Sequence, residues 1–247
     1  MSTASPSLRG NSTDDLKGTS LLLHGVVRAD HPSAGRVVTW QDLAMVVSDW
    51  HQPTREDAVA HLEMLGKLVV DGPVVPLRFG TTATDEESVC AEVLAASAPR
   101  LRGLLDRLDG LVELHAYLKF DEDEALRMVF DEHTVTWQET GGLDLSTRIR
   151  LGEKVAQQLV TWRRTRSDEL LAAVSAVAVD EVALPEGDHT EERRAFLLPH
   201  KEVEPARAAI TALASIAGIG AECVAPLPAY NFLTEPKETS SDSRWGW

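Results

Sequence analysis

Apolar and polar positions along this chain change from strand-like to helix-like spacing within the first seventy residues. Residues 21–27 form a continuous apolar run of strand length, and residues 36–50 contain two further short apolar runs separated by a polar turn. In residues 58–69 the apolar side chains recur at helical spacing instead. The pattern therefore predicts two or three strands followed by a helix that ends near Gly72.

The pattern then predicts a further strand, a helix and a strand. The sequence PVVPLRFGTT at residues 73–82 contains two prolines, which cannot donate to a strand ladder, so we expect this strand at a sheet edge. A helix beginning with DEESV follows, and residues 111–120 alternate as a strand. This order predicts an α+β domain over residues 21–135, in which helices cover one face of a largely antiparallel, ferredoxin-like sheet.

The last third of the chain predicts a second, smaller α+β domain over residues 148–235. It starts with a long helix, and a helix at residues 205–217 then lies between two short apolar strands. The basic run RRTR at residues 163–166 is interpreted as a solvated face of the long helix.

The remaining segments are polar and rich in turn-forming residues. Residues 136–147 contain two adjacent glycines and are predicted to be a linker. Residues 1–20 are predicted to be a disordered leader, and residues 236–247 a flexible tail.

Composition narrows the classes of partner and the compartment. The chain has 247 residues, of which 43% are apolar, and a formal net charge of −15, which argues against binding to nucleic acid. Cys90 and Cys223 are the only cysteines, so we expect reduced thiols in the cytoplasm rather than a disulfide framework. No apolar run approaches the roughly 18 residues that cross a bilayer, so no membrane partner is expected.

Motifs for catalysis or cofactor binding are missing from the sequence. It contains no phosphate-binding loop, no G-x-S-x-G, no H-E-x-x-H and no paired C-x-x-C. The eight histidines are scattered singly, which favours surface or hydrogen-bonded core positions over metal ligands. We therefore predict no catalytic residue, no metal site, no cofactor and no enzymatic activity, although a site assembled from distant residues would leave no local motif.

Two short segments are the candidate interaction or structural motifs. In the first, Arg78 has apolar neighbours and precedes a glycine, and its side chain is interpreted as bonded to a carboxylate or loop carbonyl rather than to a partner. The second is an aromatic segment that either packs onto the second domain or closes over the first as a clasp. The motif residues are Pro76, Leu77, Arg78, Phe79, Gly80 and Thr81, and in the aromatic segment Pro226, Pro228, Tyr230 and Phe232.

The order of these motifs resembles the gas vesicle protein F/L family of accessory proteins. The resemblance rests on VAHLEMLGKLV, then PVVPLRFGT, then the helix DEESV, then LRGLLDRLDGLVELHAYLKFDEDEA, and extends over residues 21–233. The family's closing segment, glycine-proline-x-proline-proline-tyrosine-x-phenylalanine, corresponds to APLPAYNF, where Ala225 and Ala229 replace a glycine and a proline.

The resemblance implies a non-enzymatic protein of the gas vesicle, either a minor vesicle component or an assembly factor. Its expected partners are the small apolar shell subunit and other gas vesicle accessory proteins. An acidic chain would keep a complex with a sticky subunit soluble, and the edge strand at residues 73–82 would allow strand addition by a partner. The alternative is a regulatory module that binds a small molecule, because ferredoxin-like folds host many functions.

Overall fold

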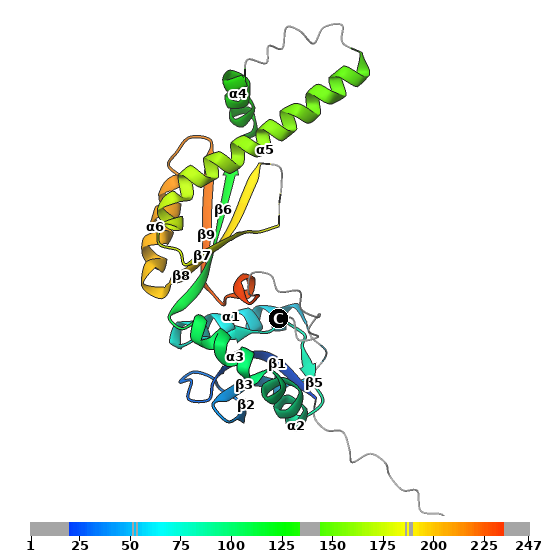
Figure 1. Cartoon of the computed structure of the whole chain (residues 1–247), viewed down its shortest axis with the longest axis vertical. Coiled ribbons are helices and arrows are strands. Elements are labelled where there is room, and N and C mark those ends of the chain that lie inside the picture. The colour runs from blue at the N-terminus through cyan, green and yellow to red at the C-terminus, as the bar shows by residue number, and fades with distance from the viewer. Residues whose placement is uncertain are drawn as a thin grey trace, which may run out of the picture.

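Two antiparallel sheets follow one another along the long axis of the molecule, with helices packed around them, as the computed structural model shows (Figure 1). The structure describes residues 20–50, 52, 54–133, 144–185, 187 and 190–234. The predicted leader apart from Ser20, the predicted linker up to residue 143, and the predicted tail lie outside the described residues. The α+β class predicted from the sequence is confirmed.

The first sheet contains the strands of the N-terminal part of the chain. Its strand order is β2-β3-β1-β4, and β5 pairs with the other end of β1. The strands are β1 (Leu21–Arg28), β2 (Val37–Trp40), β3 (Leu43–Asp49), β4 (Val75–Pro76) and β5 (Thr82–Ala83).

Helices cover both faces of the first sheet, whereas the sequence predicted helices on one face. Residues 21–27 of β1 are all buried, which a strand needs when both of its faces meet a core. Leu65 and Leu68 pack on one face, and Leu101 and Leu105 belong to the core on the other. The helices are α1 (Arg55–Asp71) on one side, and α2 (Glu86–Ser88), the π-helix η1 (Val89–Ala95) and α3 (Ala96–Arg107) on the other. We call this part of the chain the first module.

The second sheet has the order β7-β8-β6-β9 and forms the second module together with α4, α5 and α6. Its strand β6 was predicted to complete the first sheet, but it pairs with β8 and β9 instead. The spacing of apolar residues identifies a strand but not its neighbours, which explains the error. The bounds are β6 (Leu111–Phe120), β7 (Asp180–Ala183), β8 (Glu191–Pro199), η3 (His200–Glu202), α6 (Val203–Leu213), β9 (Ile219–Leu227) and η4 (Tyr230–Phe232).

The long helix α5 (Leu145–Ser175) packs on the second sheet only through its C-terminal half. All four of its buried residues lie at or after Arg163, and the helix projects past the sheet toward α4 (Glu122–His133) (Figure 1). Arg163, which the sequence placed on a solvated face, is 2% exposed, and its Nε lies 3.3 Å from a carboxylate oxygen of Glu192. The first turn of α5 also takes the last three residues of the predicted linker, and the sequence pattern did not predict α4.

The two modules share apolar core. Leu197 of β8 and Phe232 of η4 belong to the same buried cluster as β1, β3 and α3 of the first module. The modules are therefore not separated by a gap in the core, and the domain bounds 21–135 and 148–235 stay predictions.

Candidate interaction surface

The predicted proline-flanked segment forms the edge of the first sheet and then a tight turn. Val75 and Pro76 pair only with β1, as the two prolines lead us to expect. Thr81 donates from its backbone N–H (3.2 Å) and its hydroxyl (2.7 Å) to the Arg78 carbonyl. Gly80 has a φ of 87°, which suits the third position of a type II turn. The turn therefore holds the backbone around Arg78 in one conformation.

The side chain of Arg78 points away from the core. Pro76 and Leu77 are buried, Arg78 is exposed and Phe79 is partly buried. Among the residues that the structure describes, no hydrogen bond or ion pair involves the Arg78 guanidinium. The internal bond interpreted from the sequence is thus not formed with these residues.

The C-terminal aromatic segment contacts the residue that follows β4. The Tyr230 hydroxyl donates to the Leu77 carbonyl at 2.9 Å, and the Leu77 N–H donates to the His24 carbonyl at 2.9 Å. Because the N–H and C=O of one residue point to the same side in an antiparallel strand, this bond lies on the β1 side and does not occupy the outer edge of β4. Strand addition at that edge stays a prediction.

The C-terminal aromatic segment contacts both modules, which favours the clasp over packing on the second domain alone. Phe232 is 5% exposed and lies in the core of the first module, together with Leu233. Arg107 of α3 donates to the Phe232 carbonyl. Pro226 is the last but one residue of β9 in the second sheet, and Pro228 is buried. The two predicted motifs therefore meet each other, at Leu77 and Tyr230.

A buried carboxylate fixes the same segment to the second sheet. Glu113 of β6 is 1% exposed and accepts a hydrogen bond from the Asn231 backbone N–H at 3.0 Å. The Asn231 amide nitrogen and His115 Nε2 also bond to this carboxylate. A carboxylate this deeply buried needs several donors, and these three supply them.

Two buried histidines continue the hydrogen-bond chain into the first module. His24 lies where the register between β1 and β3 shifts, and its Nδ1 is 2.8 Å from Nδ1 of His61 on α1. His24 Nε2 is 2.9 Å from the Ser48 hydroxyl, and His61 Nε2 is 3.2 Å from the Leu77 carbonyl and 3.1 Å from the Tyr230 hydroxyl. The sequence analysis allowed for hydrogen-bonded histidines in the core, but it did not predict that His24 and His61 contact each other.

The contacts determine which ring nitrogen of each histidine carries the proton in this hydrogen-bond chain. A carbonyl only accepts, so His61 Nε2 carries the proton, and Nδ1 of neutral His61 is then an acceptor. His24 Nδ1 therefore donates to His61, and His24 Nε2 accepts from Ser48. Both rings are neutral, and every donor in the chain has an acceptor.

Burial perturbs the pKa values of this cluster in the direction that keeps it neutral. Burial, and secondly the nearby His61, lowers the pKa of His24 from 6.5 to about 4. Burial also lowers the pKa of His61, against the opposing effect of its bond to the Leu77 carbonyl. Burial, and secondly the charge of Glu113, raises the pKa of Tyr230 to about 12.

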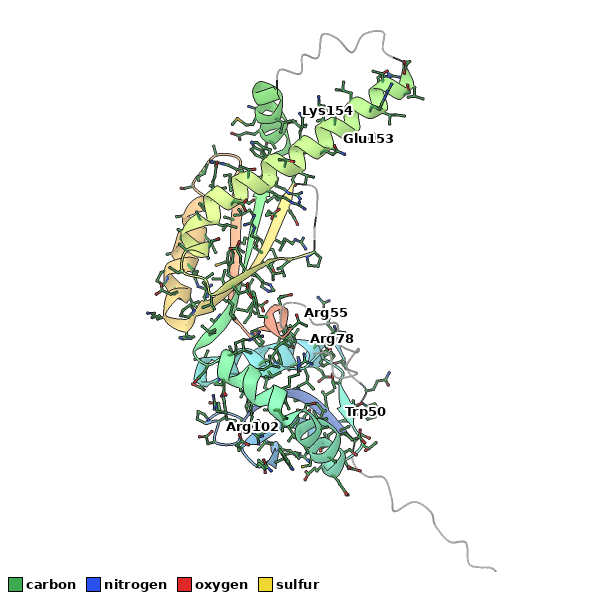
Figure 2. All side chains as sticks on the ribbon, in the orientation of Figure 1. Trp50, Arg55, Arg78, Arg102, Glu153 and Lys154 are labelled. Carbon is green, nitrogen blue, oxygen red and sulfur yellow. The ribbon has the colours of Figure 1, made fainter. Side chains whose placement is uncertain are left out.

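Other exposed groups that the sequence did not single out lie on the same side of the first module as Arg78. Figure 2 shows Trp50, Arg55 and Arg78 there. Trp50 is 48% exposed, and His61, on the same helix as Arg55, packs edge-on against Phe79 with ring centroids 5.5 Å apart. An exposed tryptophan in the sequence carries no signal of its own, because apolar spacing does not reveal which apolar residues remain uncovered.

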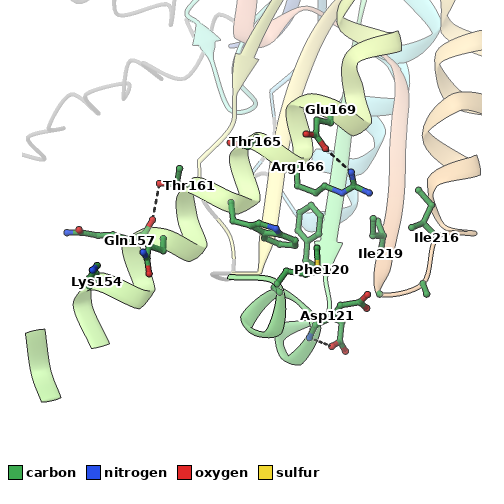
Figure 3. Close-up of a pocket in the computed structure, with 17 residues that line it drawn as sticks. Phe120, Asp121, Lys154, Gln157, Thr161, Thr165, Arg166, Glu169, Ile216 and Ile219 are labelled. Carbon is green, nitrogen blue, oxygen red and sulfur yellow. Dashed lines mark hydrogen bonds and ion pairs between the residues drawn. The ribbon is translucent and has the colours of Figure 1, made fainter. Parts of the chain in front are cut away.

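A separate groove of about 780 Å³ lies between α4, α5 and the turn before β9 (Figure 3). Phe120 and Trp162 form an edge-to-face pair at its base, with ring centroids 5.4 Å apart. Arg166 on its wall pairs with Glu169 at 2.8 Å, and Asp121 accepts from the Glu124 N–H at 2.9 Å. Arg166 and Asp121 thus have partners within the protein, whereas the buried Oε1 of Gln158, which also lines the groove, has no hydrogen-bond partner among the described residues.

Neither a metal centre nor a membrane span is evident in the described ranges. No cluster of three or more His, Cys, Asp or Glu side chains in these ranges has an arrangement that could hold a metal ion. None of the helices described is both long enough and apolar enough to cross a bilayer.

Comparison with known proteins gives a consistent match over most of the chain. The family described as "Gas vesicle synthesis protein GvpL/GvpF" matches residues 12–234. Gas vesicle protein F of Streptomyces sp. (strain CB03234) is 28% identical over 239 residues, which cover 87% of this chain and 99% of that protein.

Solved structures share the fold. The crystal structure of the gas vesicle protein GvpF from Anabaena sp. PCC7120 superposes with a TM-score of 0.75 at 15% identity, covering 90% of this chain and 99% of that one. The crystal structure of GvpF from Microcystis aeruginosa gives 0.72 at 15% identity, covering 88% of this chain and 100% of that one. At this identity the likeness establishes the fold alone.

We predict that stability falls in acid because of His24. A histidine with a lowered pKa in the folded state stabilises the fold above pH 6.5, and this contribution is lost as the pH falls toward 4. Between pH 7 and pH 5 the loss from His24 is about 2 kcal/mol. Urea unfolding at both pH values measures it. His24→Asn should reduce the difference, while the exposed control His200→Asn should keep it. An unchanged difference in His24→Asn would contradict the assignment.

We also predict that Tyr230→Phe destabilises the protein by about 1–2 kcal/mol, because it removes the hydroxyl that donates to Leu77 in a partly buried site. Chemical denaturation measures the change. Tyr117→Phe is the matched control, since the Tyr117 hydroxyl bonds, among the described residues, to His115 on its own strand, at 3.1 Å. Equal effects of the two substitutions would show that the Tyr230 hydroxyl does not hold the clasp.

Proposed function

Because the chain belongs to the gas vesicle synthesis protein GvpL/GvpF family, we propose that it binds the small apolar shell subunit and helps to nucleate vesicle formation. The family gives the chain a role as a gas vesicle accessory protein. Beyond this role, we propose that the partner is the shell subunit and that the assembly step is nucleation of the vesicle. Contact with other accessory proteins of the vesicle belongs to the same proposal.

The observation that carries the proposal is the exposed guanidinium of Arg78. It stands on a turn that two hydrogen bonds fix, and it has no partner among the described residues. Exposed tryptophan and arginine side chains, as at Trp50 and Arg55 on the same side of the first module, are the types that dominate binding energy at protein interfaces. An exposed arginine on a fixed turn, without a partner among the described residues, suits the binding of another protein.

The charge of the chain supports the same role. A net charge of −15 opposes self-association and keeps a complex with an apolar subunit dispersed. In this proposal the shell subunit binds through exposed side chains, and strand addition at the β4 edge is the alternative mode of binding.

We predict that Arg78→Ala lowers the amount of shell subunit that co-purifies with the tagged chain by at least about tenfold, corresponding to about 1.4 kcal/mol. The melting temperature should not change, because the side chain makes no bond within the described fold. Quantitative immunoblotting of co-expressed shell subunit gives the readout.

Arg102→Ala is the matched control for this experiment. Arg102 is also a partly exposed arginine of the first module, but it is paired with Asp42. This variant should retain the shell subunit. If wild-type protein retains none, the proposed function fails. If Arg78→Ala retains as much as wild type, the role of Arg78 fails.

A further inference from the structure

One side of α1 carries apolar side chains that the fold leaves uncovered. Val59 is 51% exposed, Leu62 54% and Val70 49%. Their positions follow a spacing of three and four residues that puts them on one face of a helix. We call this face the α1 stripe, and it consists of Arg55, Val59, Leu62, Gly66 and Val70.

The fold itself does not need the α1 stripe. The buried residues of α1 are His61, Leu65, Leu68 and Val69, which are centred about a third of a turn away from the stripe. A helix that packs on one sheet is expected to carry polar residues on its outer face. The apolar side chains of the stripe depart from that expectation. Their helical spacing places them on one continuous face, which exposed apolar residues scattered singly would not form.

Gly66 lies in the middle of the stripe, where glycine is unfavourable. Apart from proline, glycine is the poorest helix former, because it loses the most backbone freedom on folding. A Cβ atom added at Gly66 would meet no atom within 4 Å, so no neighbour inside the molecule requires the missing side chain. A glycine between exposed apolar residues lets the backbone of a second helix approach closely.

Unpaired positive charge at the α1 stripe indicates which charged group a partner helix would carry. Arg55 begins the stripe, and Arg78 lies on the same side of the first module (Figure 2). Neither guanidinium has an ion pair among the residues described, although the chain carries 39 acidic residues. The unpaired guanidinium of Arg55 at the N-terminal end of the apolar stripe complements a carboxylate.

We propose that the α1 stripe binds an amphipathic helix of the shell subunit, with its apolar face against Gly66 and a carboxylate at Arg55. This inference rests on the proposed function and adds the surface and the mode of binding, a helix laid along an apolar helix face. Binding buries Val59, Leu62 and Val70, and the missing side chain at Gly66 sets the distance between the two helices.

The test replaces Gly66 by a large side chain in the tagged full-length protein, co-expressed with the shell subunit. Gly66→Leu should lower the co-purified shell subunit at least tenfold, because the new side chain holds the two helices apart. The melting temperature should stay equal or rise, because leucine is a better helix former than glycine. Gly66→Ala adds one carbon and should retain more shell subunit than Gly66→Leu.

Gly103→Leu is the matched control. Gly103 lies within α3, is exposed, and also has no atom within 4 Å of an added Cβ, but its face of the helix carries Arg100, Asp106 and Arg107. This variant should retain the wild-type amount of shell subunit.

Three results would overturn the inference while wild-type protein still retains the shell subunit. These are full retention by Gly66→Leu, an equal loss in Gly103→Leu, or sedimentation showing that Gly66→Leu converts a dimer into a monomer. The last result would identify a second copy of this chain as the occupant of the stripe. If wild-type protein retains no shell subunit, the proposed function fails and the inference fails with it.

Discussion

The hydrogen bond from Tyr230 to the Leu77 carbonyl joins the C-terminal turn η4 to the residue that follows β4 of the first sheet. The same turn bonds to Glu113 of the second sheet through Asn231 and places Phe232 in the core of the first module. Without these contacts the Leu77 carbonyl would lose its Tyr230 donor and the buried carboxylate would lose two of its donors. The joint between the two modules therefore depends on one short segment.

The two buried histidines form hydrogen bonds at this joint that all run in one donor-to-acceptor direction. Because each proton position follows from its neighbour, Ser48, His24 and His61 form a one-way series of donors that ends at the carbonyl that Tyr230 also uses. A polar group in a core costs stability unless it is paired, and here the pairing works only in one arrangement of the strand, the helix and the C-terminal turn. The cluster thus selects that arrangement over other packings of the same apolar residues.

Local features of the fold could be predicted from the sequence, and long-range ones could not. The end of α1 at Gly72 and the edge position of residues 73–82 follow from helix caps and from the chemistry of proline. Spacing identified β6 as a strand, but its transfer to the second sheet depends on pairing with β8, some eighty residues later. The meeting of Leu77 and Tyr230 spans 153 positions, and no local pattern encodes it. The uncovered apolar face of α1 could not be predicted, because the spacing of apolar residues does not show which face of a helix is covered.

The position of the clasp in the chain has a consequence for synthesis. Leu77 precedes Tyr230 by 153 positions, so it leaves the ribosome long before its donor is made. A nascent chain therefore has an incomplete first core and lacks the Tyr230 bond until Tyr230 and Phe232 emerge. A product truncated before Tyr230 never gains either, so the order of translation itself separates chains that contain the clasp from fragments before any partner is met.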